Sequence, residues 1–97
     1  MIARYHRLVP DEVAAIQDHY EQRAGEKVSG DFYEELAGMI RIAAADPARF
    51  HPYNQRLRRA NLKRFPFHFL FEIRPGYIYV TVVRHHKRHP NYGLNRR

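Results

Sequence analysis

The sequence predicts an α+β fold in the order β-α-α-β-β-β, with a helical hairpin packed on one face of a small antiparallel sheet. Two patterns support this prediction. Apolar residues recur at helical spacing in two segments of the first half, and apolar residues alternate with other residues along 65–73 in the second half. A helical protein with one β-hairpin is the alternative, but it does not explain the alternation.

The first half of the chain contains the predicted first strand and both helices. Residues 2–8 are compatible with a short strand. Pro10 suits the first turn of a helix and Gly25 is typical of a residue that ends one, so the first helix is predicted between them. A second apolar stripe predicts a helix over 28–45, which the Asp46-Pro47 pair stops.

The second half contains the other three predicted strands. A weak strand is predicted over 56–62, and 65–73 places four phenylalanines and an isoleucine on one face. Residues 77–84 are apolar in both phases, with Ile78 and Val82 in the same phase, and this predicts a central strand. We expect the helices to cover one face of the sheet and the other face to be open.

The length of the chain limits its organisation and location. With 97 residues and a mass of 11.6 kDa, it forms one predicted domain over 1–97. Polar residues end the chain, so we expect 89–97 to be a flexible tail. No apolar run is long enough to cross a bilayer, and the N-terminus has no signal-peptide pattern. We therefore expect a cytoplasmic protein with no membrane partner.

Charge is divided unevenly between the two halves of a chain whose net charge is +7. Residues 1–47 hold five basic and nine acidic residues (net −4), whereas 48–97 hold twelve basic residues and one acidic residue (net +11). The second half therefore predicts an anionic partner, either a nucleic acid or an acidic protein.

Residue counts exclude several kinds of chemistry. The chain has no cysteine, so it has no disulfide, thiolate metal site or cysteine nucleophile. Ser29 is the only serine and lies where a helix cap is expected. The glycines are scattered and form no phosphate-binding loop, and we predict no cofactor. Glu72 is the only acid after Asp46, which excludes paired-carboxylate chemistry from the basic half.

Cationic side chains of the second half gather in two groups, with tyrosines and histidines between them. Cations neutralise phosphates and aromatic rings stack on unpaired bases, so this pattern suits single-stranded RNA. It suits an acidic peptide equally well, and a passive solvated surface is a third interpretation. The predicted nucleic-acid-binding residues are Arg56, Arg58, Lys63, Arg64, Arg84 and Lys87.

The cluster His85-His86-x-x-His89 is a candidate for titrating chemistry. A metal site fits poorly, because the segment follows a strand, contains Pro90 and has no nearby carboxylate, so we predict no metal. Surrounding cations would lower the pKa of a histidine here, and such a residue is a candidate general base or acid. A solvated or half-buried side chain without a chemical role is the alternative.

Four stretches stand in an order that resembles a known family. They are Ala14-x-x-x-x-x-Tyr20 running through Gly25 to Phe32 and Leu36; Asp46-Pro47-x-x-Phe50; Arg59 through Leu62 to Phe65-Pro66-Phe67; and Val83-x-His85-x-x-Arg88-x-Pro90-x-Tyr92. Over residues 4–96 the chain resembles the RelE/ParE superfamily of small bacterial toxins, of the plasmid-stabilisation type.

The resemblance implies the toxin of a type II toxin–antitoxin pair, held inactive by a cognate antitoxin that is a small acidic protein. RelE-like members cut mRNA on the ribosome without a metal, whereas ParE-like members inhibit DNA gyrase and lack the catalytic groups. Metal-independent, ribosome-associated mRNA cleavage is therefore the leading hypothesis. A gyrase inhibitor and a non-toxic antitoxin-binding homologue are the alternatives.

The resemblance also implies catalytic residues at the matching positions: His85, Arg88, Tyr92 and Arg59. Arg59 and Arg88 would hold phosphate, while His85 would be the base or acid. Tyr92 would stack on a base or relay a proton. The chain departs from the lysine-rich pattern of the best-known RNA-cutting members, and the closing segment has a structural alternative in which Arg88 is salt-bridged and Pro90 ends the strand.

Overall fold

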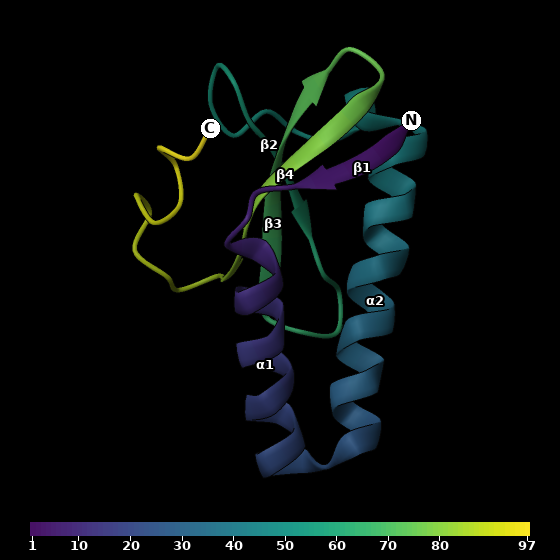
Figure 1. Cartoon of the computed structure of the whole chain (residues 1–97), viewed down its shortest axis with the longest axis vertical. Helices are drawn as coiled ribbons and strands as arrows, with labels where there is room; N and C mark the ends of the chain where they lie inside the picture. Colours follow the sequence, from purple (N-terminus) through teal and green to yellow (C-terminus); the bar gives the residue numbers. More distant parts are fainter.

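The computed structural model describes residues 1–97 and contains four strands, two α-helices and one short 3-10 helix (Figure 1). In chain order they are β1 (Ile2–Tyr5), α1 (Val9–Ala24), α2 (Glu26–Ala45), the 3-10 helix η1 (Pro47–Arg49), β2 (Arg58–Asn61), β3 (Phe67–Arg74) and β4 (Tyr77–His85). The predicted α+β class and the order β-α-α-β-β-β are confirmed.

The sheet is mixed, where the sequence predicts a wholly antiparallel one. Its strand order is β1-β4-β3-β2, and β3 is antiparallel to both β2 and β4. β1 pairs with β4 in parallel, with Ile2 opposite Tyr77. A parallel pair needs a long crossover connection, and the helical hairpin supplies the first part of it. β1 therefore lies at one edge of the sheet and β2 at the other.

The helical hairpin turns at a single residue. Gly25 ends α1 and precedes α2 with φ at 92°, a backbone conformation that glycine adopts at low cost. Figure 1 shows the two helices side by side, reaching beyond the sheet toward this turn. Ser29, expected as a helix cap, instead lies inside α2, where its hydroxyl donates to the carbonyl oxygen of Gln17 on α1 at 3.0 Å. Ser29 is buried, and its hydrogen bond joins the two helices.

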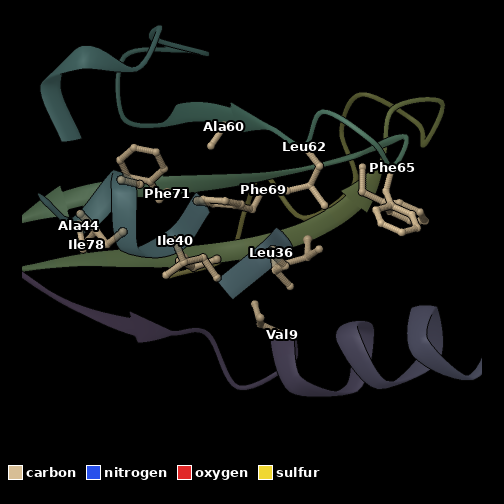
Figure 2. Packing of buried hydrophobic residues seen from close by; sticks show 14 of the residues in the cluster. Val9, Leu36, Ile40, Ala44, Ala60, Leu62, Phe65, Phe69, Phe71 and Ile78 are labelled. Atoms are coloured by element: carbon tan, nitrogen blue, oxygen red, sulfur yellow. The ribbon is translucent and has the colours of Figure 1, made fainter. Parts of the chain in front are cut away.

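The main core lies between the helices and one face of the sheet. Figure 2 shows Leu36 and Ile40 of α2 beside Phe69 of β3. Phe65 and Phe67 pack edge-on against Phe32. Burial of large side chains of this kind contributes roughly 1.5–3 kcal/mol each. The phenylalanine face predicted for 65–73 is therefore core, although Ile73, beside the β3–β4 turn, is 38% exposed.

A β-bulge changes the phase of β4. Phe71 pairs with Val80 but Leu70 pairs with Val82, so Thr81 is an extra residue. Side chains after the bulge switch faces. Val82 therefore packs in a second cluster on the opposite face, not with Ile78 as predicted.

The second face of the sheet is covered, where we expected it to be open. Leu57, Leu70 and Val82 are fully buried there. Tyr53 from the loop before β2 and two residues of the C-terminal segment 86–97, Tyr92 and Leu94, pack over them. Apolar residues on this face require such a cover. Mobility of 89–97 in solution stays a prediction, and in the structure this segment lies against the sheet.

Gly93→Ala tests this close packing. Gly93 has φ +80°, and a Cβ added there would lie 2.7 Å from Cγ2 of Val82. We expect a loss of about 1–3 kcal/mol in the free energy of unfolding, measured with urea. Gly30→Ala is the control: Gly30 is exposed in α2 with nothing within 4 Å of the added Cβ, and helix propensity predicts a gain of about 0.5–1 kcal/mol. Equal stability of the two variants would contradict the packing.

Candidate functional site

Three of the four predicted catalytic residues meet at one cavity. His85, Arg88 and Tyr92 line a space of about 210 Å³ between α1, the end of β4 and the C-terminal segment. Glu12 of α1 also lines it. Arg59 does not, because it lies on β2, where its side chain contacts Asn61 and His86.

The hydroxyl of Tyr92 is held inside the protein. It donates to Oε2 of Glu12 at 2.8 Å. The same carboxylate accepts two hydrogen bonds from the Arg96 guanidinium, at 2.8 and 3.0 Å, and one from the Val83 N–H at 3.2 Å. The Arg88 guanidinium stacks over the Tyr92 ring at 4.0 Å. Tyr92 thus anchors the C-terminal segment, and its hydroxyl proton is already donated.

The ring of His85 is oriented by the backbone. Its Nδ1 accepts a hydrogen bond from the Lys87 N–H at 3.0 Å, and Phe67 packs against it in a T-shaped contact. A backbone N–H only donates, so the neutral imidazole carries its proton on Nε2. In this arrangement the free ring nitrogen of His85 is a hydrogen-bond donor and lacks the lone pair that a general base needs.

Arg84, predicted to bind nucleic acid, is buried and structural. Its Nε donates to Nε2 of His68, and its Nη1 donates to the carbonyl oxygens of Pro90 and Tyr92, all within 2.8–2.9 Å. Its Nη2 donates to the Tyr53 hydroxyl at 2.9 Å. A guanidinium suits this task because its donors fan out in one plane.

Three more of the predicted binders are also engaged within the chain. Arg56 pairs with Glu72 at 2.6 Å, Arg58 donates to the Phe50 carbonyl oxygen at 2.6 Å, and Arg64 pairs with Asp31 at 2.8 Å. Hydrogen bonds from Arg64 and Lys27 lower the pKa of Asp31. The ammonium groups of the last two, Lys63 and Lys87, make no hydrogen bond or ion pair in the chain.

Two histidines that are not among the predicted site residues lie beside Arg59 and Arg84. His68 of β3 is fully buried opposite Arg84, and its ring plane lies within 9° of that of His86. The two Nδ1 atoms are 2.9 Å apart, and Nη2 of Arg59 lies 3.4 Å from Nδ1 of His86. The alternation along 65–73 could have placed His68 on the face opposite the core, but not beside His86.

Burial and nearby positive charges both lower the pKa values of these two histidines. Desolvation, with the positive charges of Arg59 and Arg84, lowers the pKa of His68 to about 3. Desolvation and then Arg59 also lower the pKa of His86. Both rings are therefore neutral at pH 7.

A larger, apolar groove lies between β1, α1 and α2. It measures about 740 Å³, and 13 of its 15 lining residues are hydrophobic. The residues come from β1, both helices and Val83; Ile2 and Tyr33 are 59% and 51% exposed. Arg41 is the only charged side chain among them, and the outer edge of β1 beside the groove is unpaired.

No three metal-ligating side chains of the chain converge on one point. Neither helix has the length and apolar character that crossing a membrane requires.

Comparison with known proteins shows what the fold of the chain is similar to. No family model and no curated protein matches the chain. Among solved structures, the chain resembles one from the chromosomal ParDE TA (toxin–antitoxin) system from P. aeruginosa, with a TM-score of 0.77 and 17% identity. The match covers 88% of this chain and 95% of that one. At this identity the likeness shows a common fold.

His68→Asn tests the buried histidine pair. Folding holds His68 neutral down to about pH 3, whereas the unfolded chain takes up this proton near pH 6.5. Its contribution is therefore complete above pH 6.5 and is lost as the pH falls from 6.5 toward 3. By pH 5 we expect the wild type to lose about 2 kcal/mol more than the variant. Denaturant unfolding at several pH values measures this.

His19→Asn is the matched control, because His19 is exposed on α1. It should keep the wild-type dependence of stability on pH. Parallel pH profiles for the wild type and His68→Asn would contradict a neutral buried His68.

Proposed function

We propose that the chain is the toxin component of a toxin–antitoxin system and arrests growth by binding its target, as a DNA gyrase inhibitor does. The fold shared with a chain of a ParDE TA system, over 88% of this chain, is the observation that carries the proposal. The net charge of +7 also fits a protein neutralised by an acidic partner.

The arrangement of the predicted catalytic residues favours binding over RNA cleavage. Metal-independent cleavage needs a base, a proton donor and cations around one phosphate. Here the Tyr92 hydroxyl donates its hydrogen bond to Glu12. The neutral His85 ring carries its proton on Nε2 while Nδ1 accepts from the Lys87 N–H, so neither nitrogen has a free lone pair to act as a base. Arg59 lies outside the cavity that they share. An inhibitor that acts by binding needs none of these groups to titrate.

Ribosome-associated mRNA cleavage is the second candidate. It is supported by the cations that remain unpaired at one end of the sheet, Arg59, Lys63, Lys87 and Arg88, with His86 among them. Such a surface attracts a phosphate backbone whether or not a bond is then broken.

We also propose that the antitoxin places an apolar segment in the groove beside β1. The groove exposes Ile2 and Tyr33, which a partner would cover, and the free edge of β1 offers backbone hydrogen bonds. Arg41 lies among the apolar residues and suits a carboxylate of a small acidic protein.

Tyr33→Asp tests the groove. The carboxylate would be buried against apolar side chains, so we expect affinity for the cognate antitoxin to fall at least tenfold, measured by titration calorimetry. Ile42→Asp is the matched control: Ile42 is on the same helix and 41% exposed but does not line the groove. Equal effects of the two substitutions would exclude this docking site.

Induced expression of the chain without its antitoxin tests the proposed target. We expect growth arrest with altered plasmid supercoiling and no new mRNA ends, and His85→Ala should arrest growth as the wild type does. New mRNA ends on ribosomes that disappear with His85→Ala would establish the nuclease instead. If neither chain arrests growth, the toxin proposal fails and the chain is a non-toxic homologue.

A further inference from the structure

Two arginines lie over two tyrosines near the β3–β4 turn. The Arg4 guanidinium of β1 lies 4.9 Å from the ring centre of Tyr77. The Arg74 guanidinium of β3 lies 4.2 Å from the ring centre of Tyr79. The register brings the four residues together, because Tyr77 is opposite Arg74 and Tyr79 is opposite Arg4. A guanidinium that already stacks on a ring loses less side-chain freedom when it binds a ligand.

The positive charge of these four residues, the arginine–tyrosine surface, is only partly neutralised within the chain. Arg4 is exposed and takes part in no hydrogen bond or ion pair. Arg74 pairs with Glu72 at 3.0 Å, but the same carboxylate also pairs with Arg56, so two guanidinium groups share one negative charge. The surface therefore favours an anionic partner.

Polar hydrogens on this surface are also free. Nε of Arg74 donates to Glu72 and its Nη1 approaches the Tyr77 hydroxyl oxygen at 3.5 Å, which leaves Nη2 without a partner in the chain. The Tyr77 hydroxyl accepts in that contact and keeps its own proton free to donate. Every donor of Arg4 is open. These groups come from three neighbouring strands and can bind several acceptors at once.

The geometry favours carboxylates over the bases of a single-stranded nucleic acid. Unpaired bases stack on open aromatic faces. Tyr77 and Tyr79 are only partly exposed, and each has a guanidinium over its ring. The planar fork of a guanidinium matches the two oxygens of a carboxylate, and a tyrosine hydroxyl can donate to a third oxygen. A protein segment with several Asp or Glu residues therefore suits the surface.

The arginine–tyrosine surface is distinct from both hollows of the molecule. Ala3 and Tyr5 of β1 line the apolar groove, whereas Arg4 between them does not, since successive side chains of a strand point to opposite faces. The smaller cavity includes His85, at the other end of β4 from Tyr77.

From these contacts we infer that Arg4, Arg74 and Tyr77 bind an acidic segment of the protein that the chain inhibits. The arginines supply charge and paired N–H donors, and Tyr77 supplies a hydroxyl donor. The inference rests on the proposed function in one respect, that the target is a protein. It adds the surface through which the target is held and the chemistry of the segment that is recognised.

Binding of a fluorescently labelled hexaglutamate peptide to the full chain tests the surface without the target. We expect Arg4→Gln/Arg74→Gln to bind about fivefold more weakly than the wild type at low salt. Arg23→Gln/Arg49→Gln is the matched control, with the same loss of charge. Both residues are exposed and unpaired, and Arg49 also lies over a ring, that of Phe50. The control should bind within about twofold of the wild type. No binding by the wild type, or equal losses in the two double variants, would overturn the inference.

The supercoiling reaction of DNA gyrase separates this inference from the proposed function. We expect inhibition by Arg4→Gln/Arg74→Gln to need about fivefold more protein than inhibition by the wild type or the control. If the wild type and this variant inhibit alike, the surface is wrong and the toxin proposal stands. If the wild type does not inhibit but its peptide binding still depends on Arg4 and Arg74, gyrase is not the target and the site for an acidic segment stands.

A single-stranded oligoribonucleotide provides the comparison with nucleic acid. Loss of its affinity in Arg4→Gln/Arg74→Gln, with peptide binding unchanged, would assign the surface to nucleic acid and overturn the inference. Melting curves check that each variant folds. If the double variant unfolds, Arg4→Gln alone decides the matter: it removes no hydrogen bond, and it should weaken peptide binding about twofold. Unchanged peptide affinity of this single variant would then contradict the inference.

Discussion

The carboxylate of Glu12 holds three parts of the molecule together. It lies at the first turn of α1 and accepts hydrogen bonds from the backbone of β4 and from Tyr92 and Arg96 of the C-terminal segment. Arg96 and Glu12 are only 11% and 12% exposed, so removing one partner would leave a buried unpaired charge, at a cost of about 3–5 kcal/mol. With this contact made, the C-terminal segment covers the second face of the sheet, and the Tyr92 hydroxyl has no proton to offer a substrate.

The parts of the fold that follow from local patterns were predictable. The helical stripes predicted both helices, and the alternation of 65–73 predicted β3 and the phenylalanine core. Patterns of this kind carry no information on contacts between residues that are far apart in the chain. Glu12 and Arg96 are 84 residues apart, and no periodicity links them. The extra residue at Thr81 and the parallel position of β1 likewise depend on pairing between strands.

The candidate site was predictable in composition but not in arrangement. The resemblance implied that His85, Arg88 and Tyr92 are catalytic residues, and the structure places these three side chains on one cavity. The sequence did not distinguish cations that are free to bind a partner from cations whose side chains make hydrogen bonds within the chain. Arg84, whose register partner is His68, belongs to the second kind because burial demands that each of its donors finds an acceptor. The exposed His86 is linked to this buried group through the 2.9 Å contact between its Nδ1 and that of His68, which no sequence pattern indicates.

The structure shows two separate surfaces, an apolar groove and a smaller cavity, which the distribution of charge along the sequence does not distinguish. The apolar groove and the smaller cavity share only Val83 among their lining residues. The acidic half also neutralises part of the basic half, since Asp31 pairs with Arg64 and Glu35 accepts the backbone N–H groups of Lys63 and Arg64. A partner in the groove therefore leaves the cationic end free unless its chain continues around the sheet.

The supercoiling reaction of purified DNA gyrase tests most directly whether the chain inhibits growth by binding its target. The purified chain is added to relaxed plasmid, gyrase and ATP, and to translating ribosomes in parallel. The account predicts that supercoiling falls as the chain is added while mRNA on the ribosomes stays intact. Undiminished supercoiling together with cleaved mRNA would contradict it.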